Sequence, residues 1–230
     1  MLNGQRIAIL VEDGFEDSEL TVPLKSMKAA GARVIVIGTD SAKCYLSKSG
    51  NRTITADVTA DSAEAKNLDA IIIPGGYAPD RIRLHQSMID LVRKAYADGK
   101  VIAAICHGPQ LLISADIARG HRMTSWLSIA IDLRNAGTDW VDEPVVQDGN
   151  IITSRKPVDL PVFVKAIIDA LAANSQPLEG TVASAKQEVP ERCLGKVRKQ
   201  RAIRQRSQRK GKSLQTSSSW GRETPLAADG

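Results

Sequence analysis

The stretch Val101 to Pro109 constrains the fold of this chain more than any other and reads Val-Ile-Ala-Ala-Ile-Cys-His-Gly-Pro. Five apolar residues run directly into Cys106, and an apolar helical pattern over Gln110 to Ala115 follows the proline. This order predicts a buried strand, a sharp turn and a helix start, because Gly108 permits a tight turn and proline suits the first helical position. Cys106 would then stand at an elbow between strand and helix.

An elbow cysteine at the N-terminus of a helix is a candidate nucleophile. The helix N-terminus offers free N–H groups and partial positive charge, so we expect the pKa of Cys106 to lie below the usual value of about 8.5. The alternative is a buried structural cysteine, the commoner role of a free thiol. Cys44 and Cys193 lack this setting and receive no role, and the spacing of the three cysteines fits neither a disulfide framework nor a zinc site.

Apolar strands alternate with helical periods along most of the chain, which predicts an α/β fold. Expected strands are Arg6 to Val11, Arg33 to Ile37, Ala70 to Ile73 and the strand ending at Cys106, with a hairpin turning at Asp-Gly within Val145 to Ile152. Expected helices start near Asp17 and run to Ala30, span Ser87 to Asp98, follow the elbow to about Ala118, and span Trp126 to Ala136 and Val158 to Ala173. Residues 40–62 are expected to be irregular apart from a short strand near Thr53. The pattern predicts a doubly wound, mostly parallel sheet sandwiched by helices.

Charge divides the chain into two predicted regions. Residues 1–174 carry 19 basic and 21 acidic side chains, whereas residues 175–230 carry 12 and 5. We predict an α/β domain over 1–174 and a basic tail over 175–230 that is disordered by composition. The tail is interpreted as a solvated appendage, with weak contact to nucleic acid or an anionic membrane as the alternative. No apolar run approaches the roughly 18 residues of a membrane span, and the N-terminus lacks a signal-peptide pattern, so a cytoplasmic location is expected.

Three strand ends are expected to meet at one edge of the sheet, where doubly wound folds place their sites. They bring Glu19, the pair Gly75-Gly76 and Cys106 together. A Glu19 carboxylate would raise the pKa of Cys106, whereas a protonated Glu19 could donate a hydrogen bond to a thiolate. A purely structural helix N-terminal acid is the alternative for Glu19. Glu16 is a weaker candidate that we expect to face solvent or an interface.

Backbone amides near the cysteine suggest an oxyanion hole. The N–H groups of Gly76 and His107 could stabilise a developing negative charge, although a glycine pair is also typical of a tight turn. The His107 side chain would serve as a proton-transfer group if it reached the sulfur and had an orienting acid. His85 and His121 are interpreted as surface residues.

Several motifs together resemble the PfpI family of intracellular peptidase-like, stress-associated proteins related to the parkinsonism-associated protein deglycase. The resemblance covers about residues 5–172 and rests on Glu16 to Leu20, Ile73 to Gly76, Ala78 to Arg83, Ala104 to Gln110, and Trp140 to Asp142 followed by Asp148 to Asn150. It implies a flavodoxin-like sandwich of the class I glutamine amidotransferase-like superfamily. Glutamine amidotransfer is not expected, because no His-x-Glu follows the elbow.

The resemblance also implies site roles and assembly. Cys106 would be the nucleophile, contacted by Glu19, and His107 would pair with an acid of a neighbouring subunit at the position of Asp80. The archaeal peptidase-like members have a glutamate there, so the shorter Asp80 is a departure. A dimer, or a hexamer built from dimers, is expected, with neither cofactor nor metal.

The function implied is that of a cofactor-independent cysteine enzyme of carbonyl defence, a glyoxalase III or protein deglycase. Its substrates would be methylglyoxal, glyoxal or early glycation adducts. One alternative is an intracellular cysteine peptidase that uses Cys106, His107 and a neighbour's Asp80. The other is a redox-sensing stress chaperone, in which Cys106 is oxidised reversibly without turnover.

Overall fold

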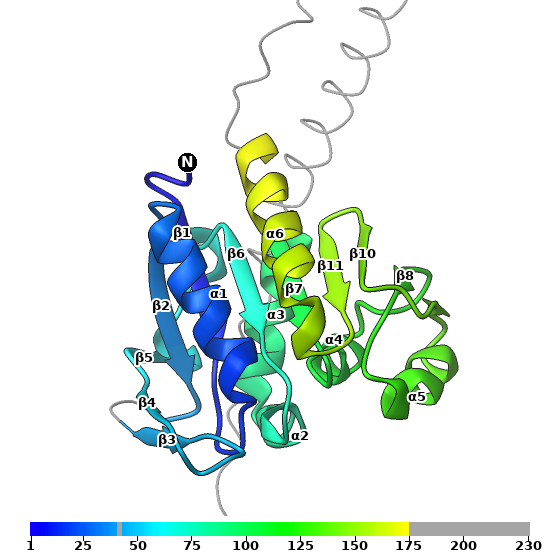
Figure 1. The fold of residues 1–230 in the computed structure, drawn as a ribbon, viewed down its shortest axis with the longest axis horizontal. Helices are drawn as coiled ribbons and strands as arrows, with labels where there is room; N and C mark the ends of the chain where they lie inside the picture. Colours follow the sequence, from blue (N-terminus) through cyan, green and yellow to red (C-terminus); the bar gives the residue numbers. More distant parts are fainter. Residues whose placement is uncertain (41–42, 175–230) are drawn as a thin grey trace, which may run out of the picture. The chain divides into compact units, whose positions relative to one another are not determined.

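A computed structural model describes residues 1–40 and 43–174 of the 230-residue chain (Figure 1). The strands are β1 (Arg6–Leu10), β2 (Arg33–Gly38), β3 (Cys44–Leu46), β4 (Thr53–Thr55), β5 (Val58–Thr59), β6 (Ala70–Ile73), β7 (Val101–Ile105), β8 (Arg122–Met123), β9 (Asp139–Trp140), β10 (Val145–Asp148) and β11 (Ile151–Ser154). The α-helices are α1 (Asp17–Ala29), α2 (Ala78–Ile82), α3 (Gln86–Ala97), α4 (Pro109–Ser114), α5 (Ala130–Asn135) and α6 (Leu160–Asn174). Short 3₁₀ turns occupy Ala60–Ser62, Ala65–Asn67, Leu127–Ile129 and Pro157–Asp159.

A seven-stranded sheet in the order β10-β11-β7-β6-β1-β2-β5 forms the centre of the fold. All neighbouring pairs are parallel except β10 with β11, which form an antiparallel hairpin at one edge. The five strands β2-β1-β6-β7-β11 follow the flavodoxin-like order, so the predicted doubly wound, mostly parallel sheet is confirmed. The crossover at β1 and β6 places the loops after β1, β6 and β7 at the same edge.

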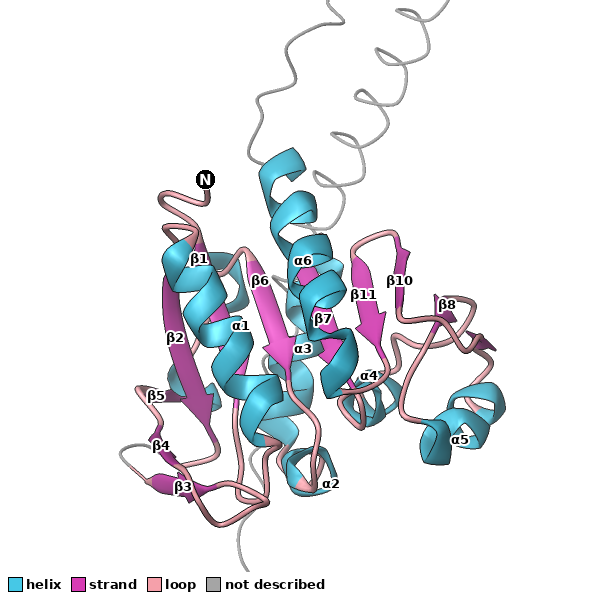
Figure 2. Cartoon of the chain, in the orientation of Figure 1, coloured by secondary structure: helices cyan, strands magenta, loops and turns pink. Residues whose placement is uncertain are grey.

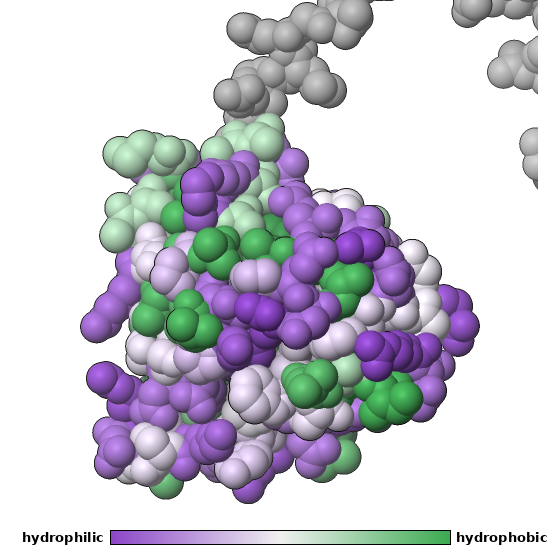
Figure 3. Space-filling model, turned by 45° about the vertical axis from the view of Figure 1, so that its right-hand side comes forward, coloured by the Kyte–Doolittle hydropathy of each residue, from purple (hydrophilic) through white to green (hydrophobic). Residues whose placement is uncertain are grey.

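Helices cover both faces of this sheet. Figure 2 shows α1 and α6 side by side across the front, with α3 behind the sheet. Every residue of β6 and of β7 is buried, as expected for central strands with helices on both sides. On the outer surface drawn in Figure 3, apolar areas are small and separated by hydrophilic side chains.

Several predicted elements differ in extent from those observed. The elbow helix α4 ends at Ser114 rather than near Ala118, since Asp116 takes a left-handed conformation with φ 56° that stops it. The helix predicted over 126–136 is divided into a 3₁₀ turn and α5, and the closing helix begins with a 3₁₀ turn at Pro157–Asp159. The hairpin turn lies at Gly149 and Asn150, one residue beyond the predicted Asp-Gly.

The segment predicted to be irregular contains more structure than expected. The β3–β4 hairpin and β5 lie within residues 43–62, and Cys44 is an exposed residue of β3. The basic tail predicted over 175–230 lies outside the described residues, so the domain boundary predicted after residue 174 stays a prediction. Within the described ranges, none of the helices has the length and apolar character needed to cross a bilayer.

Candidate functional site

Cys106 forms a strained elbow between β7 and α4, as predicted. Its φ of 60° is in the left-handed region, which residues other than glycine rarely adopt. A Cβ added at Gly108 would lie 2.4 Å from the Ile73 carbonyl oxygen and 2.9 Å from that of Ile105, so only glycine fits beneath the turn. Pro109 opens α4 as the first helical residue. The cysteine is 9% exposed.

Glu19 lies directly against this elbow with its side chain fully buried. Its Oε2 accepts the backbone N–H of Gly75 at 2.8 Å. A Cβ added at Gly75 would lie 2.7 Å from both this oxygen and the Cβ of Cys106. The absence of a side chain at Gly75 therefore lets the Glu19 carboxyl and the Cys106 thiol approach each other. Glu19, Gly75 and Cys106 lie together at one edge of the sheet, as the sequence predicts.

Glu19 and Cys106 strongly affect each other's proton affinity. Burial raises the pKa of Glu19 to about 7, against the Gly75 N–H, which lowers it. Burial, and next the Glu19 carboxylate, raise the pKa of the Cys106 thiol to about 12, although the N–H groups of Gly76 and His107 act to lower it. The expectation of a lowered cysteine pKa was wrong, since burial and the Glu19 carboxylate outweigh the N–H groups of Gly76 and His107. At neutral pH, the thiol must pass its proton to a neighbouring base as it reacts.

Glu19 is one such base. Its Oε1 is buried and makes no well-aligned hydrogen bond with another nitrogen or oxygen of the described residues. The carboxyl interacts with the Cys106 thiol strongly enough to influence both pKa values. A group with a pKa of about 7 exists in both protonation states at neutral pH and can both accept and return a proton.

His107 also contacts the sulfur, because its ring turns back over the elbow. Nδ1 lies 3.3 Å from Sγ of Cys106, and Nε2 lies 3.1 Å from Oγ of Ser128. The Trp126 ring stacks on the imidazole with centroids 6.5 Å apart. Burial, and then the charge of Lys48, lower the pKa of His107, so its ring is neutral at pH 7. Cysteine, carboxyl and imidazole thus form one cluster of interacting titratable groups.

Comparison with known proteins identifies the family of this chain. Residues 5–170 match the DJ-1/PfpI family. The chain belongs to that family. It is 41% identical over 170 residues to the protein/nucleic acid deglycase 2 of Escherichia coli, covering 74% of this chain and 99% of the relative. It is 39% identical over 166 residues to a deglycase of Thermococcus kodakarensis, covering 72% and 99%.

Solved structures of the DJ-1/PfpI family agree with the fold. A two-domain protein of Anabaena variabilis, with DJ-1/ThiJ/PfpI-like and ferritin-like domains, aligns with a TM-score of 0.72 and 43% identity. The alignment covers 73% of this chain and 48% of that one. DJ-1beta of Drosophila melanogaster aligns with a TM-score of 0.69 and 28% identity, covering 73% of this chain and 90% of that one.

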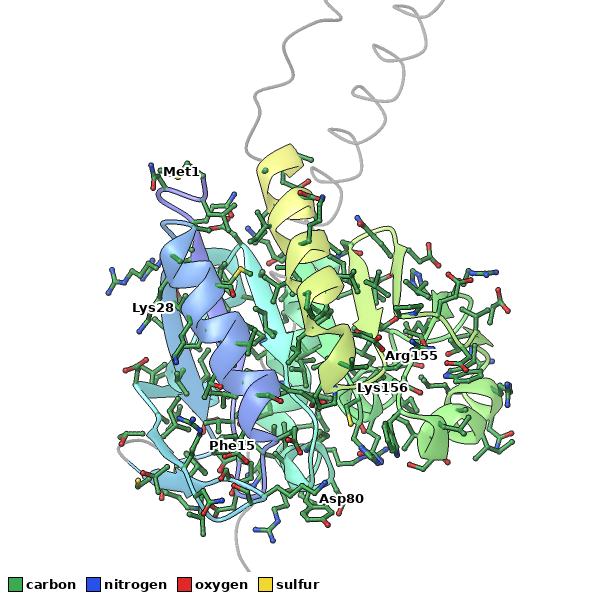
Figure 4. The ribbon with its side chains drawn as sticks, viewed as in Figure 1. Met1, Phe15, Lys28, Asp80, Arg155 and Lys156 are labelled. Atoms are coloured by element: carbon green, nitrogen blue, oxygen red, sulfur yellow. The ribbon has the colours of Figure 1, made fainter. Side chains whose placement is uncertain are left out.

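The remaining candidates differ in their contacts. Asp80 is an exposed residue of α2, at the lower edge of the ribbon in Figure 4, and no hydrogen bond or salt bridge joins its carboxylate to another described side chain. Its pairing with a neighbouring subunit's His107 stays a prediction. Glu16 is partly buried, with its carboxylate 3.8 Å from Lys48 Nζ, and raises the pKa of Glu19 through its charge. The oxyanion role of the Gly76 and His107 amides also stays a prediction.

Sequence reasoning missed the residues that surround the imidazole. Ser128 and Trp126 fall in a segment predicted as a helix, and no spacing rule connects that segment to the elbow. No sequence signal identified this contact; the structure shows that Thr124 and Ser125, the two polar residues before the tryptophan, are buried. Thr124 donates its N–H to Thr153 Oγ1 at 2.9 Å, which ties the segment to β11.

His121 is not the surface residue that was predicted. Its ring lies 2.8 Å from the Tyr96 hydroxyl and 3.1 Å from Asp148 Oδ2, and is partly buried. These contacts join α3 to the β10–β11 hairpin. No group of three or more His, Cys, Asp or Glu side chains within the described part of the chain is placed to hold a metal ion.

Proposed function

We propose that this chain is a cysteine-dependent deglycase that removes early methylglyoxal or glyoxal adducts from amines and releases the dicarbonyl as a 2-hydroxy acid. The observation that carries the proposal is the contact between a nearly buried thiol and a carboxyl group whose pKa is about 7. The deglycase names of relatives near 40% identity support it. The proposed form is a homo-oligomer in the cytoplasm.

The first step makes the carbon–sulfur bond. Sγ of Cys106 displaces the amine at the carbinol carbon of the adduct, so that the C–S bond forms as the C–N bond breaks. The thiol proton passes to the Glu19 carboxylate and from there to the leaving nitrogen, and the amine departs. The product is a hemithioacetal of the dicarbonyl on Cys106.

The second step moves a proton between neighbouring carbons. A base removes the proton from the sulfur-bearing carbon and gives an enediol, and reprotonation of the adjacent carbon gives a 2-hydroxyacyl thioester. Glu19 suits this shuttle because its pKa lies near neutrality. Backbone N–H groups of Gly76 and His107 would stabilise the oxygen that becomes negative.

Water completes the cycle. It adds to the thioester carbonyl with His107 as base, the C–S bond breaks, and lactate leaves when methylglyoxal formed the adduct. The thiol regains its proton. The net reaction is adduct plus water giving amine plus 2-hydroxy acid, so no external oxidant or reductant is consumed.

The limited access to the sulfur favours this reaction over peptide hydrolysis. With Cys106 only 9% exposed, a small carbinol reaches Sγ more readily than the carbonyl of a folded peptide. A cysteine peptidase also relies on a thiolate–imidazolium pair. The raised pKa of Cys106 and the lowered pKa of His107 both oppose that pair.

The test uses a methylglyoxal adduct of N-acetyl-lysine freed of excess methylglyoxal, in a buffer without amines or glutathione. We expect amine and lactate to appear in equal amounts, faster than the adduct dissociates spontaneously. A second assay supplies free methylglyoxal in place of the adduct. Rapid loss of free methylglyoxal, with amine release from the adduct no faster than spontaneous dissociation, would indicate a glyoxalase instead. Absence of lactate from both substrates would contradict the proposal, and a peptide assay would then test the peptidase alternative.

A further inference from the structure

Hydrolysis of the proposed thioester creates a negative charge that the adduct does not carry at its reacting carbons. Lactate forms as a carboxylate on Cys106, beside Glu19 and within reach of the charge of Glu16, which also acts on Glu19. We infer that Lys48 is a specificity-determining residue that binds this carboxylate, so that the site holds small 2-hydroxy acids more tightly than their uncharged analogues. The inference deepens the proposed function and rests on it for the identity of the anion.

The hairpin that carries Lys48 is fixed to the loop after β1. Tyr45 of β3 is fully buried and anchors the hairpin in the core. Gly14 donates its N–H to the Leu46 carbonyl at 2.8 Å. Lys48 donates its own N–H to the Phe15 carbonyl at 2.8 Å. The backbone at Lys48 is therefore held at a set place, at the end of the sheet where α2 also lies (Figure 1).

The Lys48 side chain reaches toward the loop after β6. Its Nζ lies 5.2 Å from the centre of the Tyr77 ring, and Tyr77 directly follows Gly76, whose N–H acts on the elbow thiol. Burial has the largest influence on the pKa of Glu19 and on that of His107, and the charge of Lys48 also acts on both, in the lowering direction. A cation is thus held near the groups that surround the sulfur.

The ammonium group of Lys48 keeps hydrogen-bonding capacity for a ligand. It has three N–H donors, and the acid paired with it is Glu16, whose Oε2 lies 3.8 Å from Nζ, beyond hydrogen-bond range. The Lys48 side chain is 43% exposed. A carboxylate entering the site can accept a charge-assisted hydrogen bond from Nζ, which is stronger than the bond that an uncharged amide oxygen accepts.

A positive charge at this place distinguishes the products of the proposed reaction from its reactants. The carbinol and the thioester are uncharged at their reacting carbons, so they gain little from Lys48. The carboxylate gains a partner that offsets its repulsion by Glu19 and Glu16. The lysine amine released in the first step becomes positively charged in water, and Lys48 repels it. The same residue therefore favours departure of the amine and binding of the acid.

The test measures how far lactate protects Cys106 from alkylation by iodoacetamide, with lactamide as the uncharged ligand of similar size. The proteins are the full-length wild type, Lys48→Met, Lys48→Arg and the control Lys28→Met, which changes an exposed lysine in the last turn of α1. The alkylation rate of each protein with ligand is divided by its own rate without ligand at the same pH. This ratio removes any change in the acidity of the thiol.

We expect lactate to protect the wild type more strongly than lactamide does. Lys48→Met should raise the lactate concentration needed for half-protection about tenfold, because a charge-assisted hydrogen bond is lost. Lys48→Arg keeps the charge and should restore most of the affinity. Lys28→Met should equal the wild type, and the half-protecting concentration of lactamide should be the same in all four proteins.

Equal lactate protection in Lys48→Met and the wild type would overturn the inference. Lactamide that protects the wild type as well as lactate, or lactate that fails to protect it, would do the same. The assay needs no turnover, so its result is separate from that of the deglycase assay. Protection that depends on Lys48, with no lactate formed from any adduct, would remove the deglycase proposal and leave the carboxylate subsite. Adduct turnover with protection that ignores Lys48 would remove this inference alone.

Discussion

Glu19 Oε2 accepts the backbone N–H of Gly75 at 2.8 Å. The bond connects the first helix to the loop after β6, and the same glycine leaves room for the Cys106 side chain. It holds a fully buried carboxyl beside a thiol, where burial keeps the carboxyl partly protonated near neutral pH. The chemistry proposed for this chain depends on that placement, and three predictions follow from its physical consequences.

Replacing Glu19 by glutamine should separate thiol acidity from turnover. The carboxylate is the second largest cause of the raised Cys106 pKa, so the thiol pKa should fall in Glu19→Gln. Turnover should nevertheless decrease at least a hundredfold, because the amide cannot carry the proton between carbons. Iodoacetamide alkylation against pH gives the first quantity and lactate release gives the second. Turnover that rises together with thiol acidity would show that Glu19 only opposes the nucleophile.

The buried carboxyl should also make stability depend on pH in an unusual direction. The pKa of Glu19 in the folded state, about 7, exceeds the ordinary value of 4.5. Between these two pH values Glu19 carries a proton in the folded state and has lost it in the unfolded state. The free energy of unfolding should therefore fall as pH rises through this window. From pH 5.5 to 7.5 we expect the wild type to lose about 2 kcal/mol more than Glu19→Gln. Urea unfolding at the two pH values measures this, and equal losses would contradict a buried, protonated Glu19.

Adding one methyl group at Gly75 should disable the site. The added Cβ would lie 2.7 Å from Cys106 Cβ and from Glu19 Oε2, and 2.9 Å from the backbone nitrogen of His107. These groups must move apart, and we expect Gly75→Ala to lower kcat about a hundredfold. Gly50→Ala is the control, since its Cβ meets nothing within 4 Å although its φ is +75°. It should cost about 1 kcal/mol of stability and leave kcat unchanged; similar kcat losses in both variants would refute the steric argument.

The parts of the site predictable from sequence are those with local causes. Five apolar residues before Cys106, Gly108 and Pro109 after it, predict the strand, the turn and the helix start. The rule that parallel strands end at one edge predicts that Glu19 and the glycine pair approach the cysteine. Each of these inferences needs only spacing and residue type.

The remaining parts depend on three-dimensional placement. The raised pKa of Cys106 results from how deeply the sulfur is buried, which a helix-dipole argument does not include. The contact between His107 and Ser128 joins residues 21 positions apart through a turn, and the segment containing Ser128 had been predicted as continuous helix. A hydroxyl near an imidazole has no recognisable sequence spacing.

The most direct test of the account is amine release from the purified methylglyoxal–lysine adduct by the full-length wild type, Cys106→Ser and Cys44→Ser. Cys44 is exposed on β3 and serves as the matched cysteine. We predict that Cys106→Ser reduces release to the spontaneous rate with no lactate, while Cys44→Ser equals the wild type. Lactate production that survives in Cys106→Ser would contradict the central claim that the elbow cysteine carries the reaction.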